Sequence, residues 1–175
     1  MSQPARKDRT NTIQLLILLV GLVLLSYYAT VSLTSRDPLW LLREFEDRPS
    51  RIVVYHGGQR TALLPGQAGF DELADAVQTC LAEGFARLSN LGFSERSLQD
   101  AYTRSVTLEV FWDRPVELHT WFPTGRTTQM LFPITGRHAE LSAVLLGDKG
   151  QYRAGAPVLN TMDPVREALQ SLGYY

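Results

Sequence analysis

Residues 13–33 read IQLLILLVGLVLLSYYATVSL, and this apolar run determines how the rest of the chain is arranged. From Ile13 to Leu25 there is no charged residue, and Gln14 is the one polar side chain. A helix of about 20 residues crosses a hydrocarbon core of roughly 30 Å. Tyr27 and Tyr28 follow near its end, where amphipathic rings favour the headgroup level of a membrane. The run therefore predicts a transmembrane anchor over residues 13–33.

The charges that flank this run predict its orientation. Arg6, Lys7 and Arg9 precede the run with a single acidic residue, whereas Arg36 and Asp37 after it cancel each other. Basic residues are enriched on the cytoplasmic side of membrane helices. We therefore expect a cytoplasmic N-terminus and a folded domain on the extracytoplasmic side of the cell membrane.

A cleaved signal peptide is the alternative, because it shares the basic start and the apolar core. Signal peptides have cores of about 7 to 15 residues, and this run is longer. Small residues at a suitable offset for cleavage occur at Thr30-Val31-Ser32 alone, next to bulky tyrosines. An uncleaved anchor is the favoured interpretation, and residues 1–12, which are polar, are predicted to form a disordered cytoplasmic tail.

The composition after the anchor argues against nucleic-acid binding and indicates the cellular compartment of the domain. That part of the chain is slightly acidic, because three of the 17 basic residues but one of the 18 acidic residues precede it. Nucleic-acid binding needs a basic surface, so no nucleic-acid partner is predicted. Cys80 is the sole cysteine, which permits no internal disulfide. The sequence has no Asn-x-Ser/Thr site, which favours a bacterial envelope over a secretory pathway.

The segment 34–50 is predicted to connect the anchor to the domain. Asp37-Pro38 is typical of a helix start, and apolar residues then recur at helical spacing. We expect a short helix from Pro38 to Asp47. It either lies on the membrane with Trp40 as an anchor or packs on the domain as its first helix.

Residues 51–175 are predicted to form one α+β domain. Apolar residues alternate where strands are expected and recur every three or four residues where helices are expected. Short loops between consecutive strands imply an antiparallel sheet with helices packed on one face. The expected elements are a hairpin over 51–56 and 59–64, a long helix over 70–88, a short helix from Ser94 to Asp100 or Tyr102, strands over 105–112, 116–122, 128–134, 141–146 and 151–158, and a helix from Asp163 that ends near Gly173.

The sequence carries no recognised catalytic pattern. Gly-x-Ser-x-Gly, P-loop, His-Glu-x-x-His and Cys-x-x-Cys motifs do not occur. His56, His119 and His138 are the candidate ligands for a transition metal, and the expected strand order separates them along the sheet. We therefore predict no catalytic residues, no metal and no cofactor.

The candidate binding residues come from the expected order of loops. In an antiparallel meander, successive loops alternate between the two ends of the sheet, which predicts that Arg114, Arg137 and His138 share one end. Arginine matches carboxylate and phosphate groups, so this end is a candidate anion site, with a solvated rim of locally paired charges as the alternative. Trp121 is either the wall of a ligand groove or part of the core.

These patterns together predict a binding function. We expect a membrane-anchored, extracytoplasmic, non-catalytic module that docks another envelope or membrane protein. The alternative is a domain that binds or senses a small anion or a cell-wall fragment. An envelope enzyme with an unfamiliar site is a third possibility.

Overall fold

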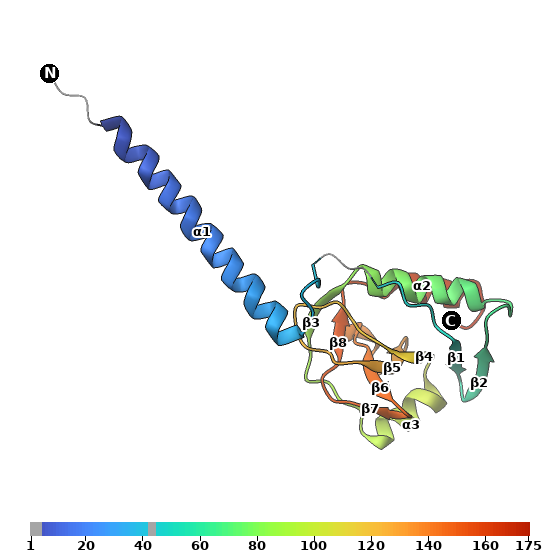
Figure 1. Cartoon of the computed structure of the whole chain (residues 1–175). Coiled ribbons are helices and arrows are strands. Elements are labelled where there is room, and N and C mark those ends of the chain that lie inside the picture. Colours follow the sequence, from blue (N-terminus) through green and yellow to red (C-terminus); the bar gives the residue numbers. More distant parts are fainter. Residues whose placement is uncertain (1–4, 42–44) are drawn as a thin grey trace.

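A single helix, α1 (Ala5–Ser35), projects from the folded domain (Figure 1). The structure is a computed structural model and describes residues 5–41 and 45–175. Within these residues, the helix segment Asn11–Ser35 is long and apolar enough to span a membrane, with a mean hydropathy of 2.2. The helix begins before the predicted span. Residues 5–12 are therefore helical and not a disordered tail, and residues 1–4 of the predicted tail lie outside the described residues.

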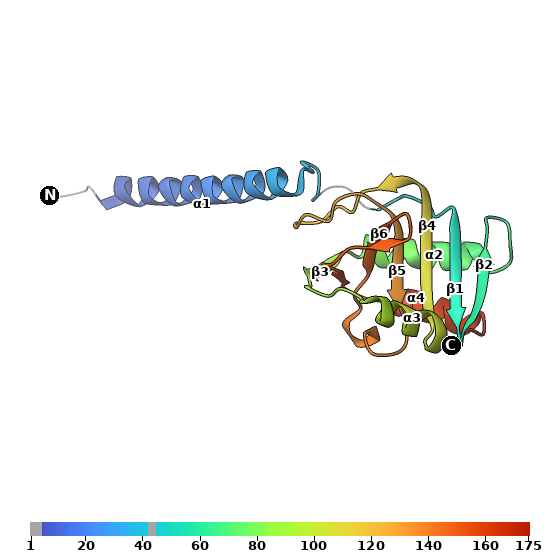
Figure 2. The same ribbon diagram turned by 90° about the horizontal axis from the view of Figure 1, so that it is seen from below.

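The domain is built on a six-stranded antiparallel sheet with the strand order β2-β1-β4-β5-β6-β7. A second sheet of two antiparallel strands pairs β3 with β8. The strands are β1 (Arg51–His56), β2 (Gln59–Leu63), β3 (Phe85–Leu88), β4 (Thr107–Val116), β5 (Thr127–Pro133), β6 (Leu145–Asp148), β7 (Gln151–Tyr152) and β8 (Pro157–Leu159). The edge strand β2 lies on the side of the domain farthest from α1, as Figure 1 and Figure 2 both show.

Two helices cover one face of this sheet. The apolar stripe of α2 (Phe70–Ala82) and that of α4 (Asp163–Ser171) pack together and onto alternate strand residues. Leu73, Val77 and Leu169 are fully buried there, as are Leu108 and Met130 of the strands. This arrangement confirms the predicted α+β class, in which helices pack on an antiparallel sheet.

A third helix, α3 (Glu95–Arg104), lies against the opposite face of the sheet. Its Leu98 and Tyr102 pack near a smaller cluster that includes Leu131 and Leu145. Ser94 accepts a hydrogen bond from the Ser97 N–H, as expected of an N-cap. A short 3-10 turn, η1 (Ala139–Leu141), completes the regular elements. The second face is thus covered at the α3 end and open at the other.

The long helix predicted over residues 70–88 is wrong beyond its thirteenth residue. Gly84 has a φ of +85°, a left-handed conformation that ends helices. The chain then enters β3, and Phe85 and Leu88 pair with Leu159 and Pro157 of β8. The continued apolar spacing favoured a helix over this segment, and the glycine overrode it.

The turn predicted at residues 113–115 is also wrong, because β4 runs through it to Val116. The pairing of β4 with β5 shifts its register between Phe111 and Val116. Such an irregularity accommodates Pro115, which has no N–H to donate to a neighbouring strand. The strand predicted over 116–122 is consequently an irregular loop after Val116, and the strand predicted over 151–158 divides into β7 and β8.

The helix predicted from Pro38 to Asp47 is absent from the described part of that segment. Residues 38–41 form turns and residues 45–47 have no regular structure, while residues 42–44 lie outside the described residues. Phe45 is buried and packs edge-on against Trp112, with ring centroids 5.9 Å apart. The Trp112 Nε1–H donates to the Asp47 carbonyl at 3.1 Å. The segment around Phe45 is therefore fastened to the domain.

Candidate functional site

The structure separates Arg114 from Arg137 and His138. Pro133 at the end of β5 pairs with Thr107 at the start of β4, so the corner that holds Arg137 lies at the Thr107 end of the sheet. Arg114 stands seven residues further along β4, roughly 23 Å away at 3.3 Å per residue. The prediction that the three residues share one end is therefore wrong, because it depended on a turn where the strand continues. Whether each residue binds a ligand stays a prediction.

Arg137 and His138 do lie together. They line a cavity of about 70 Å³ next to α3, with Asp100 and Ser97 also in its wall. The His138 ring stands 4.6 Å from the Phe93 ring, centroid to centroid. Burial and, secondarily, the neighbouring Arg137 charge lower the pKa of His138, which favours its neutral form. The cavity is well below the roughly 300–1,000 Å³ of typical ligand pockets.

Trp121 belongs neither to that cavity nor to the core. It lies in the loop between β4 and β5, and its side chain is exposed. Its ring packs edge-on against the buried Phe122, with centroids 5.1 Å apart. Phe122 in turn contacts Phe85 of β3 at 6.4 Å. Trp121 is therefore a fixed aromatic side chain on the surface.

A broad groove occupies the part of the second sheet face that α3 leaves open. Its volume is about 800 Å³, and its walls include Arg51, Leu64, Glu109, Phe111 and Gln129. Leu64 directly follows β2, and the other four residues come from β1, β4 and β5; these strands are neighbours in the sheet order. The sequence does not place these walls together, because they join residues up to 100 positions apart only after the strands have paired.

A buried carboxylate lies at one end of the groove. Glu109 is 7% exposed and accepts hydrogen bonds from three tyrosine hydroxyls: Tyr55 at 3.0 Å, Tyr102 at 3.1 Å and Tyr152 at 2.6 Å. The donors come from β1, α3 and β7, so the cluster ties three elements to β4. Burial and, secondarily, the Glu109 charge raise the pKa of each tyrosine, so the hydroxyls keep their protons and remain donors.

The middle of the groove presents an arginine on an aromatic ring. Arg51 of β1 and Phe111 of β4 are directly paired across the strands. The Arg51 guanidinium carbon lies 4.0 Å from the centre of the Phe111 ring, a cation–π contact. Leu64, 48% exposed, adds an apolar side chain at the rim. The groove thus combines charged side chains of both signs with apolar surface.

The far wall of the groove is fixed by Gln129. Its side chain is 2% exposed, and its Oε1 accepts a hydrogen bond from the Gly150 N–H at 2.9 Å, in the turn between β6 and β7. A Cβ added to Gly147 would lie 2.7 Å from the Gln129 Nε2 atom, so glycine is required there for the amide to fit. This packing holds the β6–β7 turn at a defined position beside the groove.

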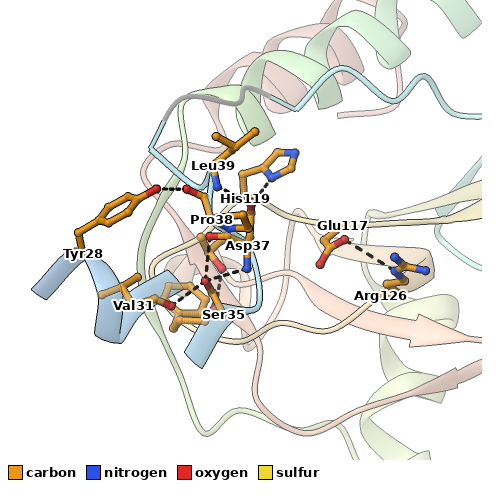
Figure 3. Close-up of polar contacts among 11 residues, drawn as sticks. Tyr28, Val31, Ser35, Asp37, Pro38, Leu39, Glu117, His119 and Arg126 are labelled. Carbon is orange, nitrogen blue, oxygen red and sulfur yellow. Dashed lines mark hydrogen bonds and ion pairs between the residues drawn. The ribbon is translucent and has the colours of Figure 1, made fainter. Parts of the chain in front are cut away.

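The end of α1 is attached to the domain by a second group of polar contacts (Figure 3). The His119 Nδ1 atom lies 2.5 Å from the Asp37 Oδ2 atom, and both side chains are largely buried. The Asp37 Oδ1 atom accepts a hydrogen bond from the Leu39 N–H at 2.9 Å, and the Tyr28 hydroxyl donates to the Pro38 carbonyl. We call these contacts the junction; they connect α1 to the loop over residues 117–126.

His119, one of the three histidines considered as metal ligands, contacts Asp37 in the junction. Among residues 5–41 and 45–175, no group of three or more His, Cys, Asp or Glu side chains is placed to hold a metal ion. No family model, curated protein or solved structure matches the chain.

Proposed function

We propose that the protein is a single-pass, membrane-anchored module whose extracytoplasmic domain docks another envelope or membrane protein through the groove. The observation that carries this proposal is the pairing of Arg51 with Phe111 in a groove of about 800 Å³ on an open sheet face. Arginine and aromatic residues are enriched at the energetic centres of protein interfaces. The module is non-catalytic in this proposal and acts by binding.

The form of the groove supports a protein partner over a small molecule. Small-molecule sites are concave and enclose roughly 70–90% of their ligand. This groove is broad and runs across neighbouring strands, from Glu109 to the turn at Gly150. Its two ends are held by the tyrosine cluster and by Gln129, so little ordering is needed when a partner binds, which favours affinity.

The membrane anchor in the proposal is supported by α1. The segment Asn11–Ser35 has 25 residues, and at 1.5 Å per residue it is about 37 Å long, enough for a hydrocarbon core of roughly 30 Å. Its apolar side chains are exposed, apart from Val31 near its end, which is 8% exposed. Basic residues precede the segment, which favours a cytoplasmic N-terminus.

Cross-linking in native membranes, followed by co-purification, tests the docking surface. The Arg51→Ala, Phe111→Ala double variant removes the cation–π pair, and Arg96→Ala on α3 removes an exposed arginine outside the groove. The double variant should lose the co-purified partner at least about tenfold, equivalent to 1.4 kcal/mol, while Arg96→Ala keeps it. A partner retained equally by both variants would exclude the groove as the docking surface.

A second candidate function, binding of a small anion, is favoured by the proximity of Arg137 and His138 in one cavity. The cavity of about 70 Å³ suits an anion of a few atoms and not a cell-wall fragment. Titration calorimetry with inorganic phosphate should show saturable heat that Arg137→Ala removes and Arg96→Ala preserves. Equal heats for the two variants would eliminate this site.

A further inference from the structure

Exposed apolar side chains gather where α1 meets the domain. Leu39 is 37% exposed and Leu41 is 62% exposed on the segment that follows the helix. Trp121 is 46% exposed on the loop over residues 117–126, which lies beside the end of α1 in Figures 1 and 2. We call Leu39, Leu41 and Trp121 the membrane-proximal surface.

This surface is held in place by the junction and by aromatic packing. The Asp37–His119 contact joins the two segments that carry its residues. The loop side is fixed by the packing of Trp121 on the buried Phe122. On the helix side, Val31 is 8% exposed although it lies in the apolar helix, so this part of α1 is covered. The surface therefore keeps its position relative to the end of α1.

We infer that the membrane-proximal surface lies in the headgroup layer of the same bilayer that α1 crosses, so that the domain rests on the membrane. The inference rests on the membrane anchor of the proposed function, and it adds a second contact of the chain with lipid. The occupant follows from continuity: Leu39 and Leu41 stand four and six residues after Ser35, where the candidate span ends.

The dimensions agree with this placement. The candidate span is about 37 Å long, whereas a bilayer measures about 30 Å across its hydrocarbon core and 40–45 Å with its headgroups. The last turn of the span therefore reaches the headgroup layer, and the residues that follow the span begin in that layer. Tryptophan is enriched at this level, and apolar side chains of interfacial segments enter roughly 5–10 Å of it. A water-exposed Trp121 would instead leave a large apolar ring hydrated.

Lipid-quenching of site-specific fluorophores tests the inference in the full-length chain. An environment-sensitive probe is attached to Leu41→Cys, to Trp121→Cys and, as a control, to Gln59→Cys on β2, the strand farthest from α1. The native Cys80 is buried, and the unsubstituted chain measures its background labelling. Each labelled protein is reconstituted into phosphatidylcholine vesicles that contain headgroup spin-labelled lipid.

The probes at positions 41 and 121 should be quenched several-fold more strongly than the probe at position 59. Equal and weak quenching at all three positions, with a protein that resists alkaline extraction, would overturn the lipid contact and leave the anchor intact. Release of the protein by alkaline extraction would overturn the anchor and, with it, the lipid contact. If the probes at positions 41 and 121 report shielding from water in native membranes but not in lipid vesicles, the surface contacts a protein partner, and the inference is overturned.

Discussion

The tyrosine cluster around Glu109 gives a sharp test of the structure, and Tyr152→Phe is the smallest change that probes it. The substitution removes one hydroxyl and leaves the ring. The lost hydrogen bond, at 2.6 Å, is the shortest of the three to the Glu109 carboxylate. A hydrogen bond to a charged group contributes about 1.5–3 kcal/mol. Phe no longer buries a hydroxyl, which offsets part of this loss, so we expect a net loss of about 1–3 kcal/mol.

Thermal unfolding of the full-length chain in detergent micelles measures the effect. For a protein of this size, each kcal/mol shifts Tm by roughly 2–4 °C, so Tm should fall by about 2–12 °C. Tyr175→Phe is the matched control, because Tyr175 is 55% exposed at the end of the chain. Exposed substitutions of this kind stay within about 0.5 kcal/mol.

A second variant separates the cluster from a general effect of losing one hydroxyl. Glu109→Gln keeps the shape of the side chain, but it removes the charge and replaces one acceptor oxygen by an NH2 donor. It therefore weakens or removes all three bonds and should cost more than Tyr152→Phe. Tyr55→Phe should cost less, since its bond is longer at 3.0 Å and ends on the other carboxylate oxygen. If Tyr152→Phe and Glu109→Gln both behave like Tyr175→Phe, the buried carboxylate does not hold these elements together.

Two further predictions concern the core and its titration. Leu81→Ala on α2 should lower the free energy of unfolding by about 2–5 kcal/mol, because Leu81 is 3% exposed in the main core. A loss below about 0.5 kcal/mol in urea unfolding would contradict that packing. Burial raises the pKa of Cys80 from 9.0 to about 11. The unfolded chain therefore loses the thiol proton at a lower pH than the folded chain does. The free energy of unfolding should fall as pH rises from about 9 to 11, by up to about 1.4 kcal/mol per pH unit. Urea unfolding at a series of pH values should show a shallower decline in that interval for Cys80→Ala, and an unchanged slope would contradict the burial of the thiol.

Local patterns predicted the elements whose signals lie within the segment itself. The hairpin over residues 51–64 forms as expected, with Gly57 and Gly58 both at positive φ. Ser94 caps α3, and α4 begins at Asp163 with proline beside it. In each case a turn or cap residue and the adjacent periodicity predict the same element, so the local sequence was sufficient without tertiary contacts.

The errors arose where tertiary pairing overrode a local signal. Pro115 suggested a turn, but β4 absorbs it in an irregular register, and this one difference moved Arg114 away from His138. Phe85 to Leu88 continued a helical stripe, but pairing with β8 drew them into a strand after Gly84. The Glu109 cluster had no local signal at all, because its tyrosines at positions 55, 102 and 152 meet only through sheet pairing and α3 packing.

The strand β4 and the loop that follows it link the groove to the junction, and this constrains the position of the partner. Phe111 forms part of the groove, and His119, eight residues later, forms the junction with the end of α1. Eight residues span at most about 26 Å, at 3.3 Å per extended residue. The groove therefore lies within about that distance of the helix end, in a domain whose linker at Phe45 is packed against Trp112. If α1 crosses a bilayer, this distance is comparable to the membrane's own hydrocarbon thickness of roughly 30 Å. A partner that is itself embedded in the membrane reaches the groove with a short extracytoplasmic segment, which is the physical reason to seek it first among membrane proteins.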